Sequence, residues 1–272
     1  MPMRPLQAAC GLCLAAALVA PGTPRALAAE DLQPHQAVYR MTMTPGSRSV
    51  DVASADGLMV YRAARECGGW AVENRTVIRF GDADGRTFED KWTFVSWEAD
   101  DGLAYRFRVL HETGGETERI EGSATLEAKG GAGLAIYTTP EDLTIELPAG
   151  TLFPTEHLRR LIAAAQSGST IFQRVVFDGT TQDNPYLVNV VIAALRDRDE
   201  PPLAEAAGAP PAPAYWTRGA FFPHDTDSEV PEFEMSIELR VDGIAERLEQ
   251  EFEDLGLRGA LRSVELLPPP EC

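Results

Sequence analysis

Residues 233–243 read Phe-Glu-Met-Ser-Ile-Glu-Leu-Arg-Val-Asp-Gly, and this stretch decides the fold class of the chain. Its apolar and polar residues alternate with a period of two, which is typical of a β-strand with one buried face. The Asp-Gly pair at its end suits the tight turn of a hairpin, because both residues accept a positive φ. A strand followed at once by such a turn indicates an antiparallel sheet.

The same alternation recurs along the chain, for example over residues 72–80 and 103–109. Further Asp-Gly pairs stand at 56–57, 84–85, 101–102 and 178–179. These signals predict about twelve strands. Because a sheet of that size rarely stays open and flat, we predict a mainly β fold. In it, one long antiparallel sheet curls into a broken barrel, or β-spiral, with one packed α-helix.

The predicted helix covers residues 154–166. Pro154 is tolerated in a first helical turn, and Gly168 stands where a glycine commonly follows the last one. An apolar stripe recurs at helical spacing through Leu158, Leu161, Ile162 and Ala165.

A second segment, residues 186–195, is a long apolar run rich in β-branched side chains. It predicts a strand covered on both faces, with the helix on one of them.

Residues 1–28 are predicted to be a secretory signal peptide. Arg4 precedes an apolar run from Ala8 to Ala20, and Ala26-Leu27-Ala28 offers small residues before a cut. The alternative is an uncut membrane anchor, although the run is short for a spanning helix. No later stretch is long enough to span a bilayer, so we expect a soluble exported protein.

Cleavage leaves two cysteines, Cys67 and Cys272, because Cys10 and Cys13 lie inside the leader. An even pair in an oxidising compartment predicts a disulfide. Cys272 follows three consecutive prolines, and this stiff arm would fix the end of the chain to the sheet. Two free thiols are the alternative.

Residues 196–214 interrupt the strand pattern with charged residues, Pro, Ala and Gly. This composition predicts a flexible excursion between two strands. The alternative is a linker between two domains. Because the strands on both sides look alike, we predict one domain over residues 29–272.

Composition narrows the class of partner. The 272 residues hold 24 Lys+Arg against 42 Asp+Glu, for a formal net charge of −18. Nucleic acids and anionic membrane surfaces both require clustered cations, so neither is an expected partner. We expect a monomer, since no heptad pattern is present.

The sequence carries no motif for hydrolysis, nucleotide binding or a zinc protease. Residues 82–85, Asp-Ala-Asp-Gly, resemble the start of a calcium loop, but position 91 is Lys where that loop needs Glu, so we predict a hairpin turn. His224 and the acids at 225 and 227 could bind a metal, although an ordered turn is the simpler interpretation. For His157 we expect a role in fixing the helix start. We predict no metal, cofactor or catalytic residue.

Aromatic residues concentrate on three consecutive predicted strands. They are either sheet core or the lining of an apolar ligand groove. The candidates for the groove are Trp70, Trp92, Trp97, Tyr105 and Phe107, with Phe94 in the same band.

Several features together resemble one family. Pro-Ala-Gly-Thr-Leu-Phe-Pro-Thr-Glu-His at 148–157 opens the lone helix, and Val-Phe-Asp-Gly follows at 176–179. With the exported all-β chain and the cysteine pair, these segments resemble the EipB-type cell-envelope integrity proteins, a periplasmic family of alphaproteobacteria. The resemblance runs from about His35 to Cys272. Its most specific residues are Gly150, Thr151, Phe153, Pro154, Thr155 and His157.

The resemblance implies a β-spiral with a packed helix and an intramolecular disulfide between Cys67 and Cys272. It also implies a role in envelope homeostasis under stress, and no established catalytic residue. The principal hypothesis is therefore a non-enzymatic periplasmic protein that binds another envelope component, such as an unidentified protein. A carrier or sensor of a lipid or lipoprotein acyl chain is the alternative. A hydrolase of envelope polymers is a third hypothesis, and it requires paired carboxylates or a nucleophile in a cleft.

Overall fold

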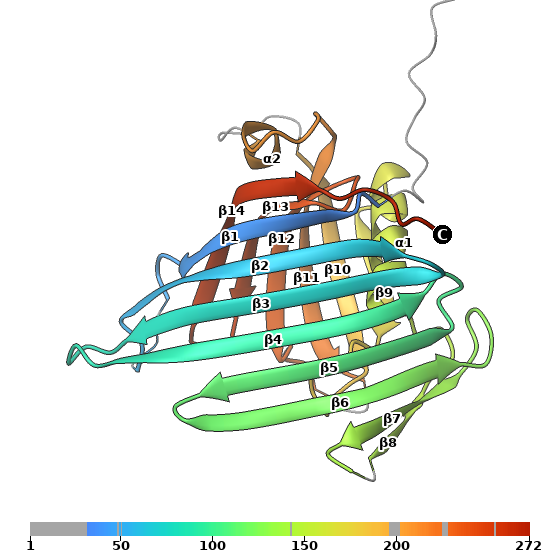
Figure 1. Cartoon of the computed structure of the whole chain (residues 1–272), viewed down its shortest axis with the longest axis horizontal. Helices are drawn as coiled ribbons and strands as arrows, with labels where there is room; N and C mark the ends of the chain where they lie inside the picture. Colours follow the sequence, from blue (N-terminus) through green and yellow to red (C-terminus); the bar gives the residue numbers. More distant parts are fainter. Residues whose placement is uncertain are drawn as a thin grey trace, which may run out of the picture.

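The structure, a computed structural model, describes residues 32–47, 49, 51–141, 143–195, 202–224, 228–252 and 254–272. Within these ranges lie fourteen strands and two helices (Figure 1). The elements in chain order are β1 His35–Met43, β2 Ser54–Glu66, β3 Gly69–Gly81, β4 Thr87–Ala99, β5 Ala104–Thr113, β6 Glu116–Leu126, β7 Gly133–Thr139, β8 Thr144–Leu147, α1 Pro154–Gln166, β9 Ile171–Val176, β10 Tyr186–Ala194, α2 Leu203–Ala206, β11 Ala214–Pro223, β12 Phe233–Arg240, β13 Ala245–Glu251 and β14 Gly256–Leu266.

The strands form one antiparallel sheet in the order β8-β7-β6-β5-β4-β3-β2-β1-β14-β13-β12-β11-β10-β9. Because β1 pairs with β14, strands from the two ends of the chain meet in the middle of the sheet. The sheet curls so that β2–β6 cross in front of β9–β13 (Figure 1). Its outer strands, β8 and β9, do not pair, and a single described bridge, Leu152–Val176, joins the two margins. The predicted curled, unclosed antiparallel sheet is confirmed.

Twist and local irregularity produce the curl. A sheet of this many strands accumulates right-handed twist, and register shifts at Val38/Tyr39, Glu121/Gly122 and Glu238/Leu239 bend individual strands further. Gly122 permits the bend because a Cβ there would lie 2.6 Å from the Phe107 ring.

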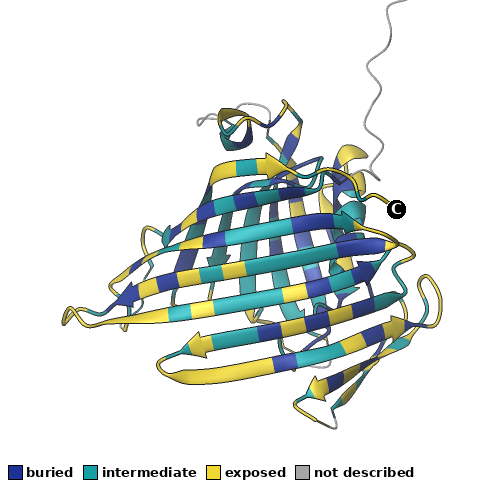
Figure 2. Cartoon of the chain, viewed as in Figure 1, coloured by how far each residue is buried: buried dark blue, intermediate teal, exposed yellow. Residues whose placement is uncertain are grey.

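Side chains alternate between the interior and solvent as the sequence predicts. In β3, for example, Ile78 and Phe80 are buried, whereas Arg79 is exposed. Figure 2 shows that burial weakens toward the tips of the β3–β4 and β5–β6 hairpins, where the first residues of β4 and β6 are exposed. Burial of these strands is therefore greatest at their ends near α1 and decreases toward these tips.

The bounds of α1 agree with the predicted helix, and Leu161, Ile162 and Ala165 of its stripe are buried. Ser167 is its C-cap, and Gly168 follows with φ +85°. The prediction that residues 186–195 are covered on both faces is wrong. In β10 only alternate residues are buried, and Val191 is 52% exposed. Its outward β-branched residues are therefore surface residues of a one-sided strand.

Three of the Asp-Gly pairs, at 84–85, 101–102 and 242–243, form the turns β3–β4, β4–β5 and β12–β13. The pair at 178–179 lies in the loop between β9 and β10. The pair at 56–57 is not a turn but lies inside β2, where a Cβ on Gly57 would lie 2.2 Å from the carbonyl oxygen of Val77. At this position glycine serves close backbone approach rather than chain reversal.

The described part of the excursion, residues 202–213, differs from a free linker. It forms α2, and Ala204 and Ala209 are 0% and 6% exposed in a core cluster with Ala37, Tyr39 and Ile244. Short apolar side chains let the segment lie close against the sheet. Residues 196–201 of the excursion, like the predicted leader at 1–28, lie outside the described residues.

Candidate functional site

A cavity of about 240 Å³ lies within the curl of the sheet. Inward residues of β1–β4 form one side, and the start of α1 and the β12–β13 turn form the other. An engineered apolar cavity of about 150 Å³ binds benzene. The space here therefore suits a small apolar ligand, or one end of a longer one.

The wall of the cavity is mainly apolar. Trp70, Val72 and Phe94 come from alternate positions of β3 and β4, and Leu158 comes from α1. Tyr61 of β2 adds a hydroxyl that makes no hydrogen bond with any described residue. Burial raises the pKa of Tyr61 to about 12, so this hydroxyl is neutral and can donate to a ligand.

The segment 150–157 positions α1 at the cavity. Gly150 adopts φ +91°, and the Thr151 hydroxyl donates to the carbonyl oxygen of Pro148 at 2.7 Å. Phe153 is fully buried, with its ring 5.1 Å from that of Tyr105. Pro154 then occupies the first turn of the helix, where its missing N–H costs no hydrogen bond. The motif is thus a turn, an aromatic anchor and a helix start.

Glu98 of β4 completes the helix start. Its two carboxylate oxygens accept the backbone N–H groups of Thr155 at 2.6 Å and Glu156 at 2.9 Å. Burial raises the pKa of Glu98 to about 7, although the N–H groups favour the ionised form. The carboxylate therefore caps α1 from another element, since Phe153 at the N-cap provides no side-chain hydrogen bond.

Sequence reasoning missed Glu98 and expected His157 to fix the helix start. A signal for Glu98 was present, because it is two residues from Ser96 and four from Phe94 and so lies on the same inward face of β4. It is an acid at a buried position of that strand. His157 instead packs against Phe172, with ring centres 5.5 Å apart, and burial lowers its pKa to about 4.

His35 is a second enclosed histidine, and it lines the cavity. Its Nδ1 donates to the carbonyl oxygen of Gln33 at 2.7 Å, which makes Nε2 the unprotonated nitrogen. Burial lowers the pKa of His35, although Asp242 opposes the shift. This histidine is therefore neutral at physiological pH.

The structure separates the predicted groove aromatics. Trp70 lines the cavity. Trp92 lies on the same inward face one step beyond Phe94, with its ring 5.4 Å from His111. Tyr105 and Phe107 are 1% and 3% exposed within a separate core cluster.

Trp97 does not share this face. It has odd parity on β4, and the Arg106 guanidinium lies 5.6 Å from its ring centre on the outer face. The outer position excludes Trp97 from any groove inside the curl.

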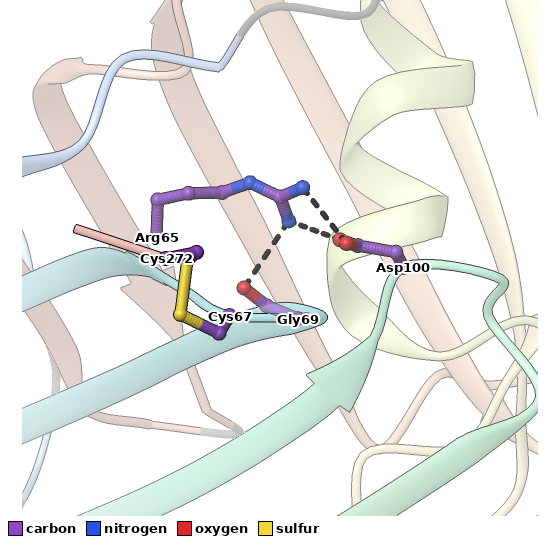
Figure 3. Close-up of a disulfide and its surroundings, with 5 residues drawn as sticks. All are labelled: Arg65, Cys67, Gly69, Asp100 and Cys272. Atoms are coloured by element: carbon purple, nitrogen blue, oxygen red, sulfur yellow. Dashed lines mark hydrogen bonds and ion pairs between the residues drawn. A yellow bond between two sulfur atoms is a disulfide. The ribbon is translucent and has the colours of Figure 1, made fainter. Parts of the chain in front are cut away.

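Cys67 and Cys272 form a disulfide with a Cα–Cα distance of 5.8 Å, as the sequence predicted (Figure 3). Beside it, Arg65 forms a two-pronged ion pair with Asp100 and donates to the carbonyl oxygen of Gly69 at 3.2 Å. These contacts join the β2–β3 and β4–β5 turns to the end of the chain, next to α1.

Metal ligands do not gather in the described residues, where no group of three or more His, Cys, Asp or Glu side chains could hold an ion. Asp82 Oδ1 accepts the backbone N–H of Arg86 within the β3–β4 turn, so residues 82–85 form the predicted hairpin turn. Residues 225–227 lie outside the described part. Among the helices that are described, none is both long and apolar enough to cross a membrane.

Comparison with known proteins identifies relatives of this chain. The chain is 25% identical over 252 residues to the cell envelope integrity protein EipB of Brucella abortus (strain 2308), covering 90% of this chain and 88% of that protein. It also matches the crystal structure of a beta-barrel-like protein of the domain of unknown function DUF1849 from Brucella abortus. That match has a TM-score of 0.78 at 22% identity, covering 88% of this chain and 99% of the other.

The second match, at low identity, concerns the fold alone. Family membership rests on the EipB-like profile, which matches residues 26–268 and so includes the helix start, the cavity wall and Cys67. The chain therefore belongs to the EipB-like family.

Proposed function

We propose that this protein supports cell-envelope integrity in the periplasm, and that it acts by binding another envelope component inside the curled sheet. The role in envelope integrity follows from the name of the Brucella abortus relative. The observation that carries the binding role is the cavity of about 240 Å³ beside α1. A disulfide between distant parts of the chain is in keeping with an oxidising compartment.

A non-enzymatic role is supported by what the perturbed groups do. Catalytic acids and bases commonly have shifted pKa values, and Glu98 and His157 have such shifts here. Both oxygens of Glu98 are engaged by the start of α1, and His157 is enclosed against Phe172. Their shifts therefore arise from structural burial, which argues against the hydrolase hypothesis.

A carrier or sensor of an acyl chain is the second candidate. It is favoured by the apolar wall that Trp70, Val72, Phe94 and Leu158 give the cavity. A protein that holds a hydrocarbon chain must exclude water from it, and a partly enclosed space inside a curled sheet does so.

The test is affinity recovery of the tagged full-length protein from the cell envelope fraction, read by mass spectrometry for both proteins and lipids. An Ala63→Leu variant, which fills the cavity, is the matched comparison, since Ala63 lines it. We expect a partner or lipid that is enriched with the native protein and depleted with the variant. Equal recovery with both proteins would contradict binding inside the sheet.

The same sample tests export. N-terminal sequencing should begin at Ala29 if the leader is removed after Ala28, and an uncleaved N-terminus would contradict that site.

A further inference from the structure

The cavity offers a ligand apolar surface without a cation. Asp178 and Asp242 are among the described residues that line it, and none of those residues is Lys or Arg. The Arg65 and Arg159 guanidinium groups lie 5.7 and 5.8 Å from the Trp70 ring centre, but neither residue lines the cavity. An anionic group placed inside would lose hydration without gaining a paired cation.

The start of α1 closes one side of the cavity, and β4 runs away from that side past Phe94. The next inward residues after Phe94 are Trp92 and Asp90, about 7 and 13 Å farther on at 3.3 Å per residue. His111 of β5 lies beside Trp92, and Glu118 of β6 lies beside His111. Asp90 Oδ2 is 2.7 Å from His111 Nε2. This stretch presents an indole ring and carboxylates to a head group.

We propose that the cavity binds the hydrocarbon chain of an amphiphile whose head group carries no negative charge. The head group lies near Trp92 and Asp90, where an indole and a carboxylate suit sugar hydroxyls or an ammonium group. The proposal rests on the carrier role above and adds selection of the head group to it. The overall charge of −18 acts in the same direction, because it repels anions at a distance.

The direct test uses three probes with the same alkyl chain: decyl maltoside, decyltrimethylammonium and decyl sulfate, each below its micelle concentration. Binding to the purified native protein is followed by calorimetry and by tryptophan fluorescence, because Trp70 lines the cavity. We expect the neutral and cationic probes to bind and decyl sulfate to bind at least about tenfold more weakly, a difference of about 1.4 kcal/mol.

Three variants connect this preference to the cavity and to the head-group position. Ala63→Leu should abolish binding of both favoured probes, whereas Ala193→Leu, at an exposed position of β10, should leave it unchanged. Thr76→Lys places a cation beside Trp92, which faces Thr76 across β3 and β4, and should strengthen decyl sulfate binding relative to decyl maltoside. The Thr76→Lys variant keeps the test decisive if Ala63→Leu does not fold.

The outcomes separate the two proposals. Decyl sulfate binding as tightly as decyl maltoside, with no change of order in Thr76→Lys, would overturn head-group selection and leave the carrier role standing. Absence of binding by all three probes would overturn the cavity as an alkyl site. Affinity recovery from the envelope would then still decide whether a protein partner occupies the curl.

Discussion

The two helices in the described part of the chain lie against the same sheet but depend on different interactions. Helix α1 has thirteen residues, buries Leu161 and Ile162, and is capped by the Glu98 carboxylate. Helix α2 has four residues and depends on Ala204 and Ala209, which lie in a different core cluster.

Arg240 connects the α2 segment to the sheet. It is 1% exposed, and its Nη2 donates to the carbonyl oxygen of Pro210 at 2.7 Å and to Asp242 at 2.6 Å. The comparison teaches that a long amphipathic helix needs little beyond its own pattern and a cap, whereas a very short one depends on a buried cation and close contact. The predictions below test this difference.

Arg240→Met should have the largest effect, because it removes the cation that faces Asp242 and the donor to Pro210. Breaking one partner of a buried pair costs about 3–5 kcal/mol. Arg258→Met is the control, because the Arg258–Glu249 pair is 42% and 34% exposed and such pairs contribute about 0–1 kcal/mol. Urea unfolding measures both changes, and equal losses would contradict the dependence of the α2 segment on Arg240.

Cys67→Ser tests how much the disulfide between the β2–β3 turn and the end of the chain stabilises the fold. The disulfide closes a separation of 205 residues, and loss of such a bond costs about 2–4 kcal/mol. Urea unfolding of the oxidised, reduced and Cys67→Ser proteins gives the comparison. The reduced protein and the variant should agree. Identical stability of the oxidised and reduced forms would show that this bond does not stabilise the fold.

Glu98→Gln tests the cap of α1 through pH. The folded pKa of Glu98, about 7, is above its unfolded value of 4.5, so its favourable contribution is complete below pH 4.5 and is lost as the pH rises through 7. The native protein should lose up to about 3 kcal/mol over this window relative to Glu98→Gln.

Burial lowers the pKa of His157 to about 4, so that histidine destabilises the fold as the pH falls below 6.5. The native protein and Glu98→Gln both contain His157, so its contribution cancels in the difference between their free energies of unfolding. Unfolding measured in steps between pH 4.5 and 7.5 gives the difference directly. A constant difference across this range would contradict the raised pKa of Glu98.

The fold was predictable where the signal is local. Alternation over 72–80 and 103–109 placed β3 and β5 and their faces, and Pro154 and Gly168 marked the start and end of α1. The α2 segment was not predictable, because an Ala- and Pro-rich composition is typical of a linker. What orders residues 202–213 is contact with strands distant in sequence.

The site was predictable only in part. Trp70 could be assigned to an inward position of its strand, and the parity of Trp97 already placed it on the opposite face from Trp92. Which inward aromatics border a cavity depends on what lies across the curl. Phe153 and Phe177 cover Tyr105 and Phe107, whereas the space beside Trp70 is left unfilled. Whether an inward aromatic is covered or borders a cavity depends on packing between distant segments, and the alternation of residues along one strand does not predict that packing.

Ala204→Leu tests the short helix most directly. Ala204 is 0% exposed in contact with the sheet, so the added carbons must force neighbours apart, at a cost of about 1–3 kcal/mol. Ala206 on the same helix is exposed, so Ala206→Leu should change the free energy of unfolding by less than about 0.5 kcal/mol. Thermal and urea unfolding of the two variants measure the two effects. Because both variants replace Ala by Leu on the same helix, the change in helix propensity is the same for both. Equal effects would mean that α2 contributes no packing, and the excursion would then resemble the linker that its composition suggests.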